Sequence, residues 1–281
     1  MDFLEILKAI LYGIVEGITE WLPISSTGHL ILLDEIIPLS VSEEFLEMLI
    51  VVIQLGAILA VPCLFFDKLN PFSRKKTQEQ RRGTLALWGK VIIGALPAGL
   101  VGVILEVFFD IPDHFAVVAA ALIIFGVGFI IVERLGLGRN ADGEFRVNSV
   151  YELSCTDALK IGAFQVLSLI PGASRSGTTT LGGMISGVSR EVSAEFSFFM
   201  AIPIMIGASG LKLLSFIGDG FSLGANEIAI LVIGIVVSFA VSLIAIKFLM
   251  GFVKRHSFTP FGIYRIILGI IVLSYFAVTL I

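Results

Sequence analysis

The fold of this chain is decided by the stretch EGITEWLPISSTGH at residues 16–29, which sets two glutamates, a proline, four hydroxyl side chains and a histidine inside apolar sequence. Residues 3–33 are otherwise apolar, but each piece beside the interruption is only about half of the roughly 20 residues that a spanning helix needs. Residues 158–188 are built in the same way around PGASRSGT at residues 171–178. We expect two re-entrant helical hairpins, because non-helical backbone at membrane depth is tolerated only inside protein or beside a wet cavity.

The composition is that of an integral membrane protein. Of the 281 residues, 57% are hydrophobic and 15% are charged, whereas soluble domains are about 45–50% apolar and about 25% charged. Continuous apolar runs favour helices over the alternating strands of a barrel. The sequence therefore predicts an all-α polytopic protein. Six segments are long enough to span a membrane, namely 45–66, 88–109, 114–133, 195–217, 227–250 and 261–281.

The remaining bulk properties exclude little. The net charge of −4 does not indicate a nucleic acid or another strongly charged partner. Cys63 and Cys155 form no motif that reports a redox compartment. Asp2 and Glu5 stand near the start without a small-residue cleavage site, so we expect no cleaved signal peptide.

The order of elements, a hairpin and three spans followed by a hairpin and three spans, predicts an internal duplication within one membrane domain, 1–281. We expect a first repeat at 1–133, a linker at 134–157 and a second repeat at 158–281. Adding 148 to the residue number pairs Pro23 with Pro171 and Ser26 with Ser174. Three spans per half give the halves opposite orientations, an inverted repeat whose hairpin tips meet near the midplane.

Lysines and arginines in the loops predict the orientation. The loops 67–87, 134–157 and 251–260 carry bases and are expected in the cytoplasm. The loops 110–113 and 218–226 carry acids and no bases, which predicts that they lie outside. Both termini then lie outside, and the first hairpin enters the membrane from that side.

Glu16 and Glu20 are four residues apart and share one face of a helix. Two such carboxylates can hold a divalent cation such as Mg²⁺ or Ca²⁺ beside a phosphate, or one of them can act as a general base. The structural alternative is a carboxylate paired with an interior arginine. Function is favoured, since two acids in one apolar hairpin are costly at membrane depth.

The tip of the first hairpin carries the hydroxyl groups. One of Ser25, Ser26 and Thr27 can cap the second half-helix, and the others are candidates for binding phosphate. Ser26 is the preferred nucleophile, given a carboxylate or an imidazole that takes its proton. His29, three residues further on, is the candidate imidazole, although a histidine in a membrane can also serve only as a hydrogen bonder between helices.

The second stretch has the features of an anion site. Its glycines permit close approach of the backbone, and the amides at a helix N-terminus favour an anion. Arg175 adds a planar fork that matches phosphate. Tight helix packing explains the glycines but not the arginine. The predicted phosphate-binding residues of this stretch are Gly172, Ser174, Arg175, Ser176, Gly177 and Thr178.

Three short runs, EGITE at 16–20, PISSTGH at 23–29 and PGASRSG at 171–177, resemble the signatures of bacterial undecaprenyl-diphosphatases of the bacitracin-resistance type. EFSF at 195–198 and PFGIYR at 260–265 extend the resemblance. The resemblance implies hydrolysis of a C55 lipid diphosphate to the monophosphate and inorganic phosphate, with a divalent metal. It also implies a multi-pass protein of the bacterial plasma membrane that recycles the peptidoglycan lipid carrier and confers bacitracin resistance. We expect the active site to open to the outer, periplasmic side of that membrane.

Position by position, the resemblance implies metal binding and activation by Glu16 and Glu20, attack by Ser26 and phosphate stabilisation by Arg175. His29 would be a further active-site partner. The competing class is a transporter or flippase of polyprenyl phosphate lipids, since inverted repeats with broken helices are typical of transporters. A structural lipid-binding protein is a second alternative, and self-association into a homodimer is left open. Release of phosphate from a pure lipid diphosphate separates an enzyme from both alternatives.

Overall fold

The structure of the chain is a computed structural model that describes residues 3–108 and 115–279. These residues form helices and turns, apart from isolated bridges of Arg139 with Phe145 and of Val147 with Val188. In chain order the helices are α1 (Phe3–Thr19), α2 (Ser26–Ile36), α3 (Glu43–Val52), α4 (Gln54–Leu64), α5 (Phe66–Leu69), α6 (Gln78–Phe108), α7 (Phe115–Leu135), α8 (Cys155–Val166), the 3₁₀ turn η1 (Leu167–Leu169), α9 (Arg175–Ile185), α10 (Arg190–Gly218), α11 (Ala225–Val253) and α12 (Thr259–Thr279).

Among the described residues, six helical segments are long and apolar enough to cross a membrane, as predicted. The first of them is α3 and α4 together, with a break at Ile53. Helix α6 begins at Gln78 rather than at residue 88, because its first two turns are polar and exposed and hydropathy does not register them. The predicted outer loop 110–113 lies outside the described residues.

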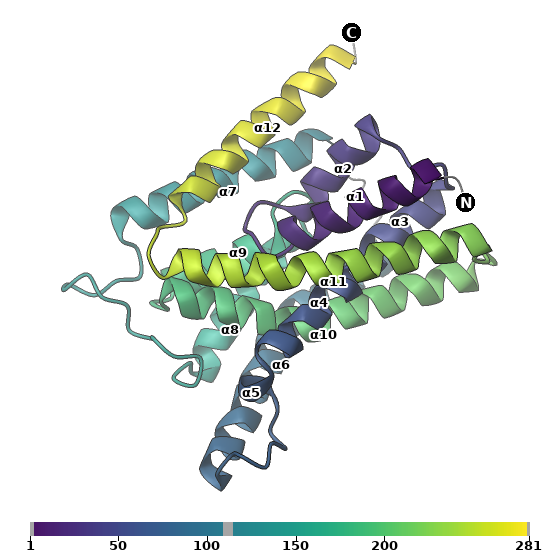
Figure 1. The fold of residues 1–281 in the computed structure, drawn as a ribbon. Coiled ribbons are helices and arrows are strands. Elements are labelled where there is room, and N and C mark those ends of the chain that lie inside the picture. Colours follow the sequence, from purple (N-terminus) through teal and green to yellow (C-terminus); the bar gives the residue numbers. More distant parts are fainter. Residues whose placement is uncertain (1–2, 109–114, 280–281) are drawn as a thin grey trace.

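The two interrupted regions each consist of short helices joined by a turn. Helices α1 and α2 have 17 and 11 residues, and α8 and α9 have 12 and 11. Each is shorter than the roughly 20 residues of a spanning helix. In Figure 1, α9 lies in the interior of the bundle, and α2 begins in the interior and runs outward beside α1. The turns thereby bring the polar residues of both motifs into the middle of the protein.

The two halves are interlocked, because each hairpin packs most extensively on a helix of the other half. Helix α1 lies along α11, and α8 lies along α6. Close approach depends on small residues. A Cβ added at Gly17 of α1 would lie 2.8 Å from the carbonyl oxygen of Ser238 in α11, so only glycine fits this crossing. The described helices of the first and second parts of the chain therefore pack closely against one another.

The two turns are capped in the same way, one residue away from the predicted register. Ser25 caps α2 and Ser174 caps α9, each accepting the backbone N–H of the glycine three residues on. Both serines have positive φ, 74° and 72°. The pairing of Ser26 with Ser174 is therefore corrected to Ser25 with Ser174, which are 149 positions apart. The second turn has one more residue between its proline and its cap, and Gly172 accommodates it at a φ of +86°.

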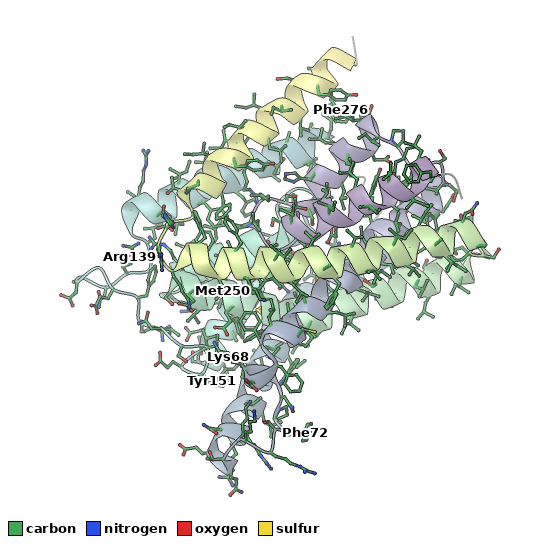
Figure 2. All side chains as sticks on the ribbon, viewed as in Figure 1. Lys68, Phe72, Arg139, Tyr151, Met250 and Phe276 are labelled. Atoms are coloured by element: carbon green, nitrogen blue, oxygen red, sulfur yellow. The ribbon has the colours of Figure 1, made fainter. Side chains whose placement is uncertain are left out.

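The linker between the halves is fastened to the first half. The Tyr151 hydroxyl donates to the carbonyl of Lys68 at 3.5 Å, and Figure 2 shows these two residues close together. The Lys68 ammonium in turn donates to Glu195 at the start of α10, at 2.5 Å. In Figure 1 the linker, α5 and the turn between α11 and α12 lie toward the lower left. The start of α1, the turn between α10 and α11 and the end of α12 lie toward the upper right.

Candidate functional site

The two turns meet at a cavity of about 200 Å³. Its walls come from both hairpins and from two spanning segments. Most of the polar side chains in the lining belong to the two motifs, so the structure joins the motifs in one site. The lining residues are Glu20, Ser25, Ser26, Thr27, Gln54, Ser168, Ile170, Pro171, Gly172, Ser174, Arg175, Ile204, Met205 and Ala208.

Glu20 lies at the centre of a buried hydrogen-bonded group. Its Oε2 accepts a hydrogen bond from the Ser26 hydroxyl at 2.7 Å. Its Oε1 accepts a hydrogen bond from Nη2 of Arg175 at 2.9 Å. The side chains of Arg175 and Glu20 are 11% and 7% exposed, so water screens this pair little. The carboxylate is within reach of the serine proton, and the guanidinium holds the carboxylate in that position. This arrangement suits nucleophilic catalysis by Ser26.

Arg175 is itself oriented by α10. Its Nη1 donates to the carbonyl oxygen of Ser197 at 2.7 Å and to the Ser197 hydroxyl at 3.2 Å, and the guanidinium lies 5.7 Å from the centre of the Trp21 ring. The Nε–H of Arg175 is buried and has no partner among the described residues. The arginine is thus pre-oriented and keeps at least one donor for a ligand.

Glu16 differs from Glu20 in its surroundings. The N–H of Glu20 donates to the Glu16 carbonyl at 3.0 Å, so the two residues are one helical turn apart. The Glu16 side chain is fully buried, and neither carboxylate oxygen has a hydrogen-bond partner among the described residues. A buried carboxylate without a partner is costly and fits a ligand that supplies positive charge.

The donor set fits a divalent cation of the Mg²⁺ type. The described residues contain no group of three or more His, Cys, Asp or Glu side chains that could hold a metal on their own. Mg²⁺ is commonly held by one or two carboxylates, with waters and substrate phosphates filling the other positions. Glu16 and Glu20 provide that number of oxygen ligands, because an ionised carboxylate that accepts two hydrogen bonds still has free lone pairs.

His29 is not placed to receive the proton of Ser26. Its Nδ1 lies 2.6 Å from the carbonyl oxygen of Ser25, which can only accept, so Nδ1 carries a proton. Its Nε2 lies 2.7 Å from the Tyr264 hydroxyl, and the two rings are stacked. Both nitrogens are therefore engaged away from Ser26. In this structure the Ser26 hydroxyl contacts Glu20 rather than His29, and the His29 ring contacts the carbonyl of the cap residue Ser25.

Several predicted phosphate ligands have structural roles. The hydroxyls of Ser25 and Ser174 accept the capping N–H bonds but also line the cavity. Ser176 donates to the carbonyl oxygens of Glu20 and Leu22, at 3.1 and 3.2 Å, and so ties the two turns together.

Four predicted phosphate ligands remain. Gly177 and Thr178 do not line the cavity, whereas Thr27 and Gly172 do. The Thr178 hydroxyl donates to the Arg175 carbonyl, and Gly177 supplies the capping N–H to Ser174. Thr27 and Gly172 belong to the lining as predicted. The second motif thus divides into residues that build the turn and residues that face the cavity.

Arg265 was not predicted as a site residue, although it holds both turns in place. Its fully buried guanidinium donates to the carbonyl of Pro23 at 3.1 Å and to those of Gly172 and Ala173 at 3.0 and 2.9 Å. One side chain of α12 thereby holds both turns. The available signal was an arginine inside an apolar span, which is a functional candidate by default. Gln54 and Ser168, which line the cavity, were also not predicted as site residues.

The chain is similar over almost its whole length to named proteins. Residues 9–271 match the family described as Bacitracin resistance protein BacA. The undecaprenyl-diphosphatase of Desulfitobacterium hafniense is 53% identical over 279 residues, which cover 99% of this chain and 98% of that protein. The undecaprenyl-diphosphatase of Enterococcus faecalis is 51% identical over 276 residues, 98% of this chain and 99% of that protein. That of Acetivibrio thermocellus is 53% identical over 278 residues, 97% of this chain and 98% of that protein.

Proposed function

The chain belongs to the family of the bacitracin resistance protein BacA, and we propose that it is an undecaprenyl-diphosphatase that acts through Glu20, Ser26 and Arg175. The reaction converts undecaprenyl diphosphate to undecaprenyl phosphate and inorganic phosphate, which returns the lipid carrier to cell-wall synthesis and confers bacitracin resistance. One observation carries the proposal. The Ser26 hydroxyl donates to a buried carboxylate that Arg175 holds in place, inside a cavity built from both motifs.

The reaction follows from these contacts in two steps. Ser26 Oγ attacks the terminal phosphorus while its proton passes to Glu20, and the bond from that phosphorus to the bridging oxygen breaks. The leaving group is the lipid monophosphate, and the terminal phosphoryl group stays on Ser26. The protonated Glu20 gives its proton to the leaving oxygen of the lipid monophosphate and is ionised again. Water then attacks phospho-Ser26 while its proton passes to Glu20, the bond from phosphorus to Ser26 Oγ breaks, Oγ takes the proton from Glu20, and inorganic phosphate leaves. Arg175 supplies fixed positive charge where negative charge is shared among the phosphoryl oxygens.

Glu16 and Glu20 would hold a divalent cation, which would supply positive charge to the diphosphate when bound. The partnerless oxygens of Glu16 support this role for Glu16. Glu20 has the additional role of proton acceptor, and its contact with Ser26 supports that assignment. The two carboxylates therefore differ in function although they lie one helical turn apart.

The proposed membrane arrangement is an inverted repeat with two re-entrant hairpins meeting near the midplane. The equivalent caps at Ser25 and Ser174 and the reciprocal packing of α1 on α11 and of α8 on α6 support it. The basic loops 67–87, 134–157 and 251–260 support a cytoplasmic position for those loops. Both termini then lie outside, and the polar cavity receives the diphosphate from the periplasmic side while the lipid tail stays in the bilayer.

Release of phosphate from pure undecaprenyl diphosphate in detergent tests the function. We expect turnover by the purified protein with Mg²⁺, almost none by Ser26→Ala, and unchanged turnover by Ser222→Ala. Ser222 is exposed in the turn between α10 and α11 and serves as the matched control. Binding of the lipid diphosphate without release of phosphate would contradict the enzyme and favour a carrier.

A further inference from the structure

Gln54 stands at the break in the first spanning segment. Helix α3 ends at Val52 and α4 begins at Gln54, with a tightened turn in which the N–H of Gly56 donates to the Ile53 carbonyl at 3.0 Å. A Cβ added at Gly56 would lie 2.1 Å from the carbonyl oxygen of Ile235, so α4 and α11 touch backbone to backbone there. This close crossing explains the break and the glycine, but it gives no reason for a glutamine.

The side chain of Gln54 lines the cavity and has no hydrogen-bond partner among the described residues. The other lining residues from spanning helices are apolar, namely Ile204, Met205 and Ala208 of α10. Gln54 is thus the one polar contribution of the described spans to this lining. Within residues 3–108 and 115–279, its amide group has no side-chain hydrogen bond, and it does not cap α4. A polar amide amid apolar sequence at membrane depth is costly unless a ligand or water satisfies it.

Arg175 is the arginine of this lining, and the protein takes up part of its donor set. The Nη1 group of Arg175 donates to Ser197, and its Nη2 group donates one hydrogen bond to Glu20. Its Nε–H has no partner among the described residues. The hydroxyls of Ser25 and Ser174 accept capping bonds, and each can still donate its own proton. A diphosphate offers many acceptor oxygens, and a primary amide has two N–H donors and no charge. A neutral donor binds an anion without disturbing the pair of Glu20 and Arg175.

We propose that the Gln54 amide donates a hydrogen bond to the diphosphate of the lipid substrate and contributes to binding rather than to the chemical step. This inference rests on the proposed function, since it assigns Gln54 to the substrate of that same cavity. It makes α4 a third contributor to the site beside the two hairpins.

The test is a comparison of Gln54→Met with the wild-type protein. Methionine keeps the length and volume of glutamine and removes both donors. We expect KM for undecaprenyl diphosphate to rise about tenfold or more, the effect of one hydrogen bond to a charged group, with kcat within about threefold. The melting temperature in detergent should not fall, because no protein contact is lost. Gln54→Glu should raise KM further through repulsion. Leu59→Met, an exposed position on the same helix, is the control.

The possible outcomes separate this inference from the proposed function. A KM within twofold of wild type in Gln54→Met would overturn the role of Gln54, as would a lower melting temperature with an unchanged KM, which indicates a structural side chain. Absence of hydrolysis by the wild-type protein would instead contradict the proposed function. A raised KM with unchanged melting temperature supports both.

Discussion

Replacing Glu20 by glutamine should have a different effect from the same change at Glu16, although the residues are one helical turn apart. Glu20 accepts the Ser26 hydroxyl through Oε2 and the Arg175 guanidinium through Oε1. Glutamine keeps the shape and one acceptor but cannot take the serine proton. The Glu16 carboxylate has no hydrogen-bond partner among the described residues, so Glu16→Gln removes a ligand for the cation and leaves Ser26 and its base in place.

The size of each effect follows from these contacts. Loss of the general base should lower kcat by about 10²–10⁴-fold in Glu20→Gln. It also leaves Arg175 without its carboxylate in a site where both side chains are nearly buried, a loss of up to about 3–5 kcal/mol in the free energy of unfolding. The bonds of Arg175 to Ser197 reduce that figure. In EDTA, Glu16→Gln should be as stable as the wild-type protein or more stable, because it removes a buried charge without a partner.

The assay combines a titration of Mg²⁺ with thermal unfolding in detergent. Raising Mg²⁺ should recover much of the activity of Glu16→Gln and little of that of Glu20→Gln. The melting temperature should fall in Glu20→Gln and not in Glu16→Gln. Recovery of Glu20→Gln by Mg²⁺, or a kcat above a tenth of wild type, would refute Glu20 as the base and leave it as a metal ligand only.

Three further results are expected. Arg175→Lys should lower kcat by about 10²–10³-fold, since a point charge cannot keep the contacts to Ser197 and the substrate together, and a near-normal rate would make the arginine peripheral. Arg265→Met should reduce both kcat and the melting temperature, because the carbonyls of both turns lose their shared donor. Arg265→Lys should recover only part of both losses. Unchanged kinetics in Arg265→Met would contradict the role of Arg265 in holding the two turns together. With the native cysteines replaced, a cysteine at Asp219 should react with an impermeant thiol reagent in intact cells and one at Lys75 should not, and the reverse pattern would overturn the proposed orientation.

The spanning helices were predictable because their signal is local. Twenty apolar residues in a row report a span whatever the neighbours are, and all six predicted segments appear among the described helices. The early start of α6 at Gln78 and the break before Gln54 were not predictable in this way. The first depends on helix propensity outside the apolar run. The second depends on how closely α4 passes the backbone of Ile235, which is a property of the tertiary structure.

The site was predictable in its chemistry and less so in its pairings. The sequence indicated a serine beside an acid or an imidazole, but only the fold brings Ser26 to Glu20 and turns His29 toward Tyr264. The sequence suggested that the hydroxyl side chains of both motifs bind phosphate. The Ser176 hydroxyl instead donates to the carbonyl oxygen of Glu20 in the first turn. Arg265 is 242 residues from the carbonyl of Pro23 that it binds, a contact that no local pattern encodes.

Rapid-quench analysis of a single turnover tests the central claim, attack by Ser26, most directly. Undecaprenyl diphosphate labelled with ³²P in its terminal phosphate is mixed with excess protein and quenched in acid at increasing times. We expect label on the peptide that contains Ser26 before free phosphate appears, and neither label nor phosphate from Ser26→Ala. Phosphate release by Ser26→Ala at a comparable rate, or release by the wild-type protein with no labelled peptide at any time, would contradict the account.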